Sequence, residues 1–216
     1  MKQYGIIGLG NFGAKVAREL TQLGGRVTAI DIDKTKIQDI QDDVYQAIIA
    51  DATDRNFLEN IEPGNFDYFV ISTGENAHAA ILITLYLNEL GAKRIIVKAV
   101  SADHAKILRK VGAAEAVIPE EQMAIKLSHS LARPNIIDYL PLASDYCVVE
   151  MKPPGKFIGK QLKELDLRKK YHIQIISIKR PTEKDHMHVP GGEYTIQESD
   201  ILMILGKESD VNKIKE

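Results

Sequence analysis

The sequence of 216 residues predicts an α/β fold in two parts. Short apolar runs alternate with segments of helical spacing over 1–133, which is typical of a parallel sheet wrapped by helices. A glycine-rich turn follows the first run, as in a doubly wound sheet. After residue 141 the pattern changes to strands around one amphipathic segment, which indicates a small α+β domain over 142–216. Pro134 and Pro141 bracket the predicted linker, 134–141.

Six apolar runs supply the strands of the first domain. In order they are QYGIIGL, RVTAIDI, YQAIIA, DYFVIST, RIIVKAV and EAVIP. With helical segments between them, these runs predict a Rossmann sheet in the strand order 3-2-1-4-5-6. The carboxyl ends of the first and fourth strands flank the ligand crevice in that order. We therefore expect the loops 8–13 and 72–76 to face one another.

The segment EEQMAIKLSHSLARP predicts a helix over about 121–132. It follows Pro119 and should end near Pro134, because proline disfavours a helical conformation in the residue before it. Beyond the linker, DYCVVEMK, IQIISIKR and DILMILG read as strands, and KQLKELDLRKKY as one amphipathic helix. The polar stretch PTEKDHMHVPGGEY predicts a hairpin.

Composition excludes several classes of protein. The 28 basic and 30 acidic residues give a net charge of -2, so no overall field favours nucleic acid or an anionic membrane. Cys147 is the single cysteine and permits no internal disulfide, which suits a reducing cytosol. No signal-peptide pattern precedes the first strand. The most apolar long segment, AHAAILITLYLNEL, is shorter than the roughly 20 residues of a membrane span. We expect a cytoplasmic protein.

Gly8, Gly10 and Gly13 lie where the first strand gives way to a helix. The first glycine permits a tight turn, the second lets backbone amides approach a pyrophosphate, and the third allows close packing of helix on strand. The helix N-terminus adds unpaired amides. Asp31 ends the second strand, where a carboxylate accepts hydrogen bonds from ribose hydroxyls and repels the 2′-phosphate of NADP. The combination predicts a nucleotide site.

Two further loops reach the same edge of the sheet. In ADATD, Asp51 and Ala52 lie where an adenine would rest, although Thr53 or Asp54 is also a candidate helix cap. In STGEN, the amides and the Thr73 hydroxyl suit phosphate or ribose contacts, with helix capping as the alternative.

Three charged residues leave more than one reading open. Lys98 ends the fifth strand, where it suits an anion or a neighbouring subunit, or extends its ammonium to solvent. Glu120 and Glu121 follow the sixth strand, and such acids are more often complements to the helix dipole than metal ligands.

Catalytic machinery is not recognisable. The histidines, His78, His104, His129, His172, His186 and His188, form no catalytic arrangement, and the pair in DHMH is more often solvated than metal-bound. No GxxxxGK[ST] loop for nucleotide hydrolysis is present. Binding without turnover is therefore the simplest interpretation.

Taken together, YGIIGLGNFGAKVARELTQLGGRVTAIDID, DATD, STGENAHAAILITLYLNELGAKRIIVKA and KVGAAEAVIPEEQMAIKLSHSL resemble the RCK (KTN) family, the TrkA- and KtrA-like regulatory subunits of prokaryotic Trk/Ktr potassium uptake systems. GKQLKELDLRKKYHIQIISIKR and ESDILMILG look like the C-terminal RCK module. The resemblance covers almost the whole chain.

The family implies a cytosolic homodimer that assembles into a tetrameric or octameric ring, docked under a membrane potassium-translocating subunit. ATP, ADP, AMP, NAD or NADH in the N-terminal cleft changes the conformation of the ring. A crossover helix at 122–131, with Met123, Ile125 and Leu127, packs on the neighbouring subunit. In some relatives a cyclic dinucleotide binds the groove between two C-terminal domains. This sequence does not show whether such an effector binds here.

The resemblance also implies site residues. Those expected to bind the nucleotide are Gly8, Gly10, Asn11, Phe12, Gly13, Asp31, Ile32, Asp51, Ala52, Thr53, Thr73, Gly74, Asn76 and Lys98. Glu120 matches a position associated with a divalent or monovalent cation.

One departure concerns the terminal phosphate. ATP-responsive relatives often carry arginine between the second and third glycines, where this chain has Asn11 and Phe12. The case for ATP over ADP, AMP or NAD is weaker for that reason, unless Lys15 or Arg18 compensates.

Two other functions remain as alternatives. An NAD-dependent dehydrogenase of a small substrate would need an acid, base or nucleophile near the nicotinamide. A redox-sensing DNA-binding protein would need a helix-turn-helix with a basic face, which the near-neutral charge and the C-terminal strands do not supply.

Overall fold

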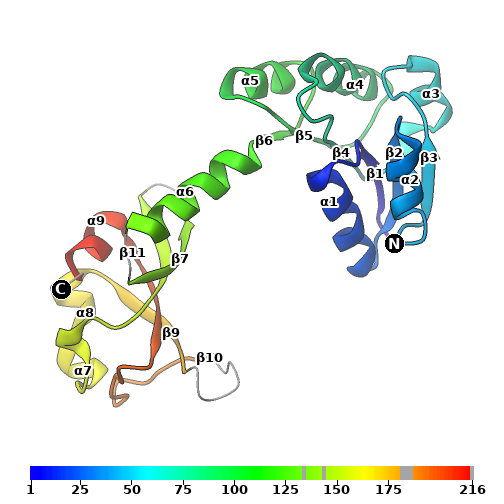
Figure 1. Cartoon of the computed structure of the whole chain (residues 1–216). Coiled ribbons are helices and arrows are strands. Elements are labelled where there is room, and N and C mark those ends of the chain that lie inside the picture. The colour runs from blue at the N-terminus through cyan, green and yellow to red at the C-terminus, as the bar shows by residue number, and fades with distance from the viewer. Residues whose placement is uncertain (133–134, 143–144, 181–186, 215–216) are drawn as a thin grey trace. The chain divides into compact units, whose positions relative to one another are not determined.

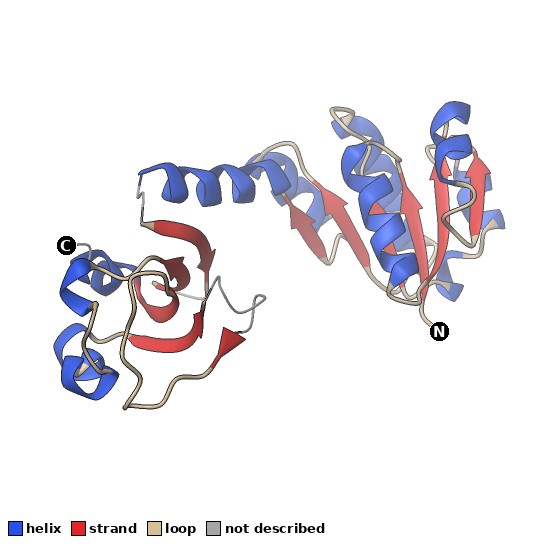
Figure 2. Cartoon of the chain, turned by 60° about the horizontal axis from the view of Figure 1, so that its bottom comes forward, coloured by secondary structure: helices blue, strands red, loops and turns tan. Residues whose placement is uncertain are grey.

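The computed structural model describes residues 1–132, 135–142, 145–180 and 187–214. The chain divides into two compact units, Met1–Pro119 and Glu120–Glu216. Each unit is built around its own sheet, shown in Figures 1 and 2.

The first unit contains a six-stranded parallel sheet. Its strands are β1 (Gln3–Ile7), β2 (Arg26–Asp31), β3 (Gln46–Ile49), β4 (Tyr68–Ile71), β5 (Ile95–Lys98) and β6 (Glu115–Val117). They pair in the order β3-β2-β1-β4-β5-β6, every neighbouring pair being parallel. The predicted Rossmann order is confirmed, and the switch point lies between β1 and β4.

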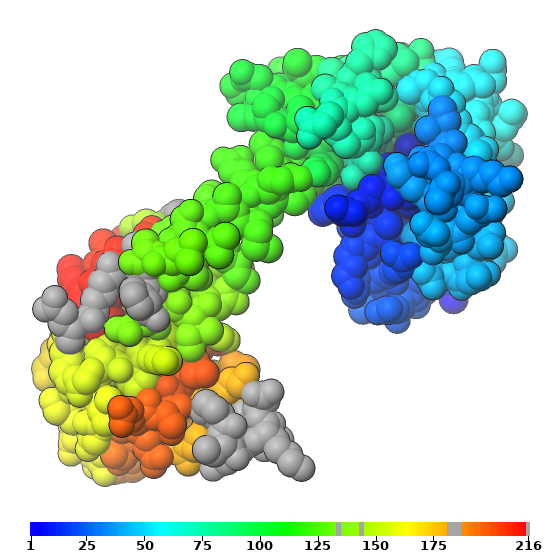
Figure 3. All heavy atoms as spheres, in the orientation of Figure 1, coloured from blue at the N-terminus to red at the C-terminus, as the bar shows by residue number. Residues whose placement is uncertain are grey.

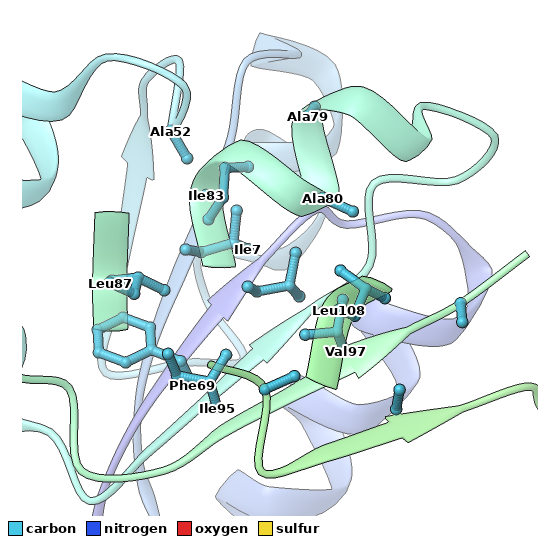
Figure 4. Close-up of a cluster of buried hydrophobic side chains, with 14 of the residues drawn as sticks. Ile7, Ala52, Phe69, Ala79, Ala80, Ile83, Leu87, Ile95, Val97 and Leu108 are labelled. Atoms are coloured by element: carbon cyan, nitrogen blue, oxygen red, sulfur yellow. The ribbon is translucent and has the colours of Figure 1, made fainter. Parts of the chain in front are cut away.

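Helices cover both faces of this sheet (Figure 2). They are α1 (Asn11–Gln22), α2 (Lys34–Ile40), α3 (Arg55–Asn60), α4 (Ala77–Glu89) and α5 (Ala102–Lys110), with a 3-10 turn η1 (Pro63–Asn65) before β4. Ile6 and Ile7 of β1 enter different buried clusters, because successive side chains of a strand point to opposite faces. Ile6 packs with α1 and α2, whereas Ile7 packs with α3, α4 and α5. Figure 4 shows the cluster that contains Ile7.

α4 is the apolar segment AHAAILITLYLNE, and its burial explains its composition. Ile83 and Leu87 are almost fully buried in the cluster of Figure 4. Thr84 is also buried, and its hydroxyl donates to the Ala80 carbonyl at 2.6 Å. Among the described residues, no helix combines the length and apolarity needed to cross a membrane.

The second unit contains an antiparallel sheet in the order β10-β9-β11-β8-β7. Its strands are β7 (Ile136–Pro141), β8 (Tyr146–Met151), β9 (Gln174–Lys179), β10 (Met187–His188) and β11 (Ile201–Lys207). Its helices are α6 (Pro119–Ala132), α7 (Leu162–Leu165), α8 (Leu167–Tyr171) and α9 (Glu208–Val211), with 3-10 turns η2 (Gly155–Phe157) and η3 (Asn212–Ile214). β10 pairs with β9 as the hairpin prediction requires, but residues 181–186, including His186, lie outside the described part.

The segment predicted as a linker is different in the structure. Residues 136–141 form β7, an edge strand paired with β8. The prediction of a linker over 134–141 is therefore wrong for these residues. Ile136 and Tyr139 are buried in the core of the second unit, and this burial overrides the proline signals. Pro134 itself lies outside the described residues.

Helix α6 groups with the second unit, whereas the sequence predicts a first domain that runs to 133. The Lys126 ammonium lies 2.9 Å from the Asp138 carboxylate of β7. The His129 ring stacks on Tyr139, with centroids 3.9 Å apart. These contacts attach α6 to β7.

The predicted helix KQLKELDLRKKY is interrupted at Asp166, which adopts a left-handed conformation (φ 45°, ψ 47°). Leu165 and Leu167 are both buried. Two positions apart, they would point to nearly opposite sides of a continuous helix. The break at Asp166 lets both enter one core, and aspartate tolerates this conformation better than most residues.

A buried carboxylate, Asp200, lies directly before β11 in the second unit. The Asp200 side chain is fully buried. It accepts hydrogen bonds from the Tyr194 hydroxyl at 2.8 Å and from the backbone amide of Gln197 at 2.8 Å. Arg180 donates to Tyr194 at 2.7 Å and lies 3.4 Å from Asp200. Burial and the bond to Asp200 raise the pKa of Tyr194 above its ordinary value.

Asp200→Ala should lower the free energy of unfolding by about 3 kcal/mol, because it leaves Arg180 and Tyr194 without their buried acceptor. Urea unfolding of the full chain followed by circular dichroism measures this loss. Glu198→Ala, at an exposed neighbouring position, is the matched control and should change stability by less than about 0.5 kcal/mol. Equal effects of the two substitutions would contradict a stabilising role for the network.

Candidate functional site

A cleft of about 370 Å³ opens at the carboxyl ends of β1, β2, β3 and β4. Its floor is apolar and contains Ile7, Ile30 and Ile83. Figure 4 shows Ile83 of α4 beside Ile7 and Ala52. Polar groups from three loops line the rim, so the cleft combines an apolar floor with a few polar groups, as small-molecule sites usually do.

The loops after β1 and β4 face one another, as the strand order predicts. Gly8 has a positive φ of 90°, and a β-carbon there would collide with the Ser72 carbonyl oxygen. A β-carbon at Gly13 would collide with the Gly8 carbonyl oxygen. Both positions therefore require glycine for the fold itself, and the predicted packing role of Gly13 is confirmed.

Gly10 is different, because neither its conformation nor its surroundings require glycine. Its φ of -68° and ψ of -175° suit any residue, and a β-carbon there would meet no atom within 4 Å. Gly10 is the N-cap of α1, and no side chain caps this helix. By contrast Asp33, Asp54, Asn76 and Ser101 cap α2, α3, α4 and α5. The first-turn amides of α1 are therefore available to an anion.

Asp31 lies at the end of β2, close to the turn that leads to this helix end. Its side chain is only 6% exposed. One carboxylate oxygen, Oδ2, accepts from the Leu9 amide at 2.6 Å, and the other, Oδ1, accepts from the Asp33 amide at 2.8 Å. The predicted ribose acid thus also connects the loops that follow β1 and β2.

The loop after β3 is arranged by Asp51. Its Oδ1 accepts from both the amide and the hydroxyl of Thr53, at 2.9 and 2.7 Å. These hydrogen bonds hold the pKa of Asp51 below its usual value. Asp54 accepts from the Asn56 amide at 2.9 Å and caps α3, so the capping alternative holds for Asp54.

The loop after β4 has both predicted features. Gly74 has a φ of 63°, a conformation that favours glycine. Asn76 caps α4 by accepting from the Ala79 amide at 3.0 Å, and the Thr73 hydroxyl donates to the Asn76 carbonyl at 3.0 Å. Capping and a place in the cleft coexist at Asn76.

Most of the predicted nucleotide-binding residues line one cleft. These are Gly8, Gly10, Asp31, Ile32, Asp51, Ala52, Thr53, Thr73, Gly74 and Asn76.

The remaining predicted residues are not among those that line it. Asn11 begins α1, Gly13 packs within the turn, and Lys98 ends β5. Phe12 packs against the cluster around Ile6 and lines a separate apolar groove with Tyr4 and Val16.

Sequence reasoning missed Lys36, which lies on α2 and lines the cleft. Its ammonium is 3.5 Å from Asp31 Oδ2. The sequence signal that could have identified Lys36 is a basic residue shortly after Asp31, the predicted ribose-binding acid. The apolar floor residues were also missed, since they are indistinguishable in sequence from other core positions.

The structure offers little support for a metal site. Glu120 and Glu121 lie in the first turn of α6. Within the described residues, no group of three or more histidine, cysteine, aspartate or glutamate side chains is placed to hold a metal.

A second cleft, of about 500 Å³, lies in the C-terminal unit. Residues of α7 and α8 line it together with β9 and the stretch 189–192, and Arg168 contributes a cation. Whether a second effector binds this domain stays a prediction.

Comparisons with known proteins agree with this architecture. Residues 4–119 match the TrkA-N domain and residues 148–216 match the TrkA-C domain. The chain is 37% identical over 214 residues to Ktr system potassium uptake protein C of Bacillus subtilis (strain 168), covering 99% of this chain and 96% of that protein.

Solved structures share the fold at lower identity. The GsuK RCK domain matches with a TM-score of 0.68 and 17% identity, over 99% of this chain and 47% of that one. The GsuK channel bound to NAD matches with a TM-score of 0.69 and 16% identity, over 97% of this chain and 38% of that one. This chain thus spans less than half of either structure. The two domain matches follow one another along the chain, and the Bacillus subtilis relative is similar along almost its whole length. The chain therefore belongs to the TrkA-N/TrkA-C family.

Proposed function

We propose that this chain is a nucleotide-sensing regulatory subunit of a Trk/Ktr-type potassium uptake system. A nucleotide in the first unit changes the conformation of a homo-oligomeric ring and thereby gates a membrane potassium-translocating subunit. The Bacillus subtilis relative named as a Ktr potassium uptake protein supports this assignment, because the alignment spans both domains. The protein would act in the cytoplasm and reach the membrane through its partner.

The observation that carries the nucleotide assignment is Gly10 at the uncapped N-terminus of α1, in the same cleft as Asp31. The fold does not require glycine at this position, but a phosphate approaching the first-turn amides does. Asp31, at the end of β2, supplies an acceptor for ribose hydroxyls in the same cleft. The two groups suit the two ends of a nucleoside phosphate.

The cleft favours a nucleotide with few terminal charges. Lys36 is the one cationic side chain among the described lining residues, and it lies beside Asp31 rather than in the phosphate loop. Nothing in the lining substitutes for the arginine found in ATP-responsive relatives. ADP, AMP, NAD and NADH therefore fit the cleft better than ATP, and NAD is the nucleotide named in the GsuK channel structure.

Binding without turnover fits the titratable groups in the cleft. Among the described residues that line it, these groups are Asp31, Lys36 and Asp51. Asp31 is held by two backbone amides, and Asp51 is held by Thr53. A dehydrogenase would need a proton donor or acceptor beside the nicotinamide, and both carboxylates are already engaged in these hydrogen bonds.

The gating role requires only a modest difference in affinity. A ligand shifts a conformational equilibrium by the difference between its affinities for the two states, and coupling of about 1–3 kcal/mol is typical. Exchange of one adenine nucleotide for another is therefore a sufficient signal. A cation at Glu120 that adds to this coupling remains part of the proposal.

The exposed apolar side chains of α6 support assembly. The exposed fractions are 62% for Met123, 44% for Ile125, 55% for Leu127 and 76% for Leu131. No residue of this helix is buried. Figure 3 shows α6 in green on the surface. Met123, Leu127 and Leu131 follow one another at intervals of four and form one stripe. A second copy of the chain is the proposed cover for this stripe.

Gly10→Val should abolish tight nucleotide binding while leaving the fold intact. A β-carbon at this position meets no atom within 4 Å, and the side chain would occupy the approach to the α1 amides. Loss of one charge-assisted hydrogen bond predicts an affinity for ADP or NAD about tenfold to hundredfold weaker. Isothermal titration calorimetry measures the affinity, and thermal unfolding of the free protein checks the fold. Wild-type affinity in the folded variant would show that phosphate does not bind here.

Leu127→Asp should weaken self-association by placing a charge in the apolar stripe of α6. Analytical ultracentrifugation over a range of protein concentrations would show the dissociation constant rising by roughly tenfold or more. Gln122→Glu, an exposed polar position on the same helix, is the control and should leave the mass distribution unchanged. If both variants kept the wild-type distribution, α6 would not be an assembly surface.

A further inference from the structure

We infer that Lys36 is a specificity-determining residue that, together with Asp31, forms hydrogen bonds with the ribose hydroxyls of the bound nucleotide. This inference rests on the proposed nucleotide site and adds to it a second recognition group. It also states which part of the ligand is recognised: the sugar hydroxyls, not the phosphates.

The loop between β2 and α2 fixes the position of Lys36. The Asp33 amide donates to Asp31 Oδ1 at 2.8 Å, and the Asp33 side chain caps α2 by accepting from the Thr35 amide at 2.8 Å. Ile37 of α2 is buried in the core on this face of the sheet. Lys36 therefore belongs to a short, well-anchored helix and projects into the lining of the cleft.

Hydrogen-bond capacity shows what the pair can accept. Each Asp31 oxygen already accepts one backbone amide and retains further lone-pair capacity for a hydroxyl donor. The Lys36 ammonium has three donors, and its contact with Asp31 Oδ2 is 3.5 Å, longer than the roughly 2.7–2.9 Å of a strong charge-assisted bond. A ribose hydroxyl can donate to Asp31 while its oxygen accepts from Lys36.

Burial and charge make this arrangement selective. The Asp31 side chain is 6% exposed and that of Lys36 is 43% exposed, so the pair lies at the boundary between floor and solvent. A hydroxyl satisfies both partners, whereas a deoxyribose leaves the buried carboxylate and the ammonium with unused capacity. The α1 amides, in a different loop, are left to bind the phosphates.

The experiment compares two ligands on four proteins. Isothermal titration calorimetry of the full chain measures binding of ADP and of 2′,3′-dideoxyADP to the wild type, to Lys36→Met, to Lys36→Arg and to Lys34→Met. Lys34 is the matched control: it lies on the same helix, is exposed and is not among the residues that line the cleft. Asp31 keeps its two backbone donors in every variant.

We expect Lys36→Met to weaken ADP binding about tenfold, as loss of one charge-assisted hydrogen bond predicts, and to change dideoxyADP binding less than about twofold. The preference of the protein for ADP over dideoxyADP should shrink accordingly. Lys34→Met should leave both affinities and their ratio at wild-type values. Lys36→Arg retains a cationic donor and should restore part of the preference.

Three outcomes would overturn the inference. Equal weakening of both ligands by Lys36→Met would mean that the lysine attracts phosphate by charge alone. The same loss in Lys34→Met would assign the effect to the charge of the helix. Wild-type affinities for both ligands in folded Lys36→Met would show that Lys36 does not contact the ribose, while leaving the proposed function intact. If the wild type bound no adenine nucleotide, the nucleotide assignment in the proposed function would fail as well.

Discussion

The carboxylate of Asp31 is the interaction on which the cleft depends. It is buried at the end of β2, and each of its oxygens accepts a backbone amide from a different loop. A buried carboxylate without donors would destabilise the fold, so these two amides must stay in place. Holding the Leu9 amide positions the turn that leads to Gly10 and the N-terminus of α1. Holding the Asp33 amide positions α2, and with it Lys36.

The glycine turn shows how structural and functional requirements divide along a short motif. Gly8 and Gly13 are required by the fold, because a side chain at either would collide with a carbonyl oxygen. The protein itself does not require glycine at Gly10, and in the proposed function this residue leaves room for a ligand at the helix end. The polar loops after β3 and β4 combine both requirements, since Asp54 and Asn76 cap helices at the rim of the cleft.

A nucleotide-dependent change must travel from this cleft through the chain that joins the two units. Helix α6 is attached to β7 by the Lys126–Asp138 ion pair and by the His129–Tyr139 stack. Its apolar side chains Met123, Leu127 and Leu131 are more than half exposed. In the proposed assembly, α6 is therefore both the connection between the units and the surface through which subunits sense one another.

The sequence by itself determined the Rossmann strand order, the convergence of the loops after β1, β3 and β4, and most of the residues that line the cleft. These follow from local patterns, because apolar periodicity places strands and helices and parallel strands bring their carboxyl ends to one edge. Only the tertiary structure decided that residues 136–141 form an edge strand, that Asp166 interrupts a helix, and that Lys36 reaches Asp31. Each of these depends on burial or on a contact with another element, such as the pairing of β7 with β8 and the shared core of Leu165 and Leu167. Local propensity carries no information about such partners, since they are chosen by the packing of the whole unit.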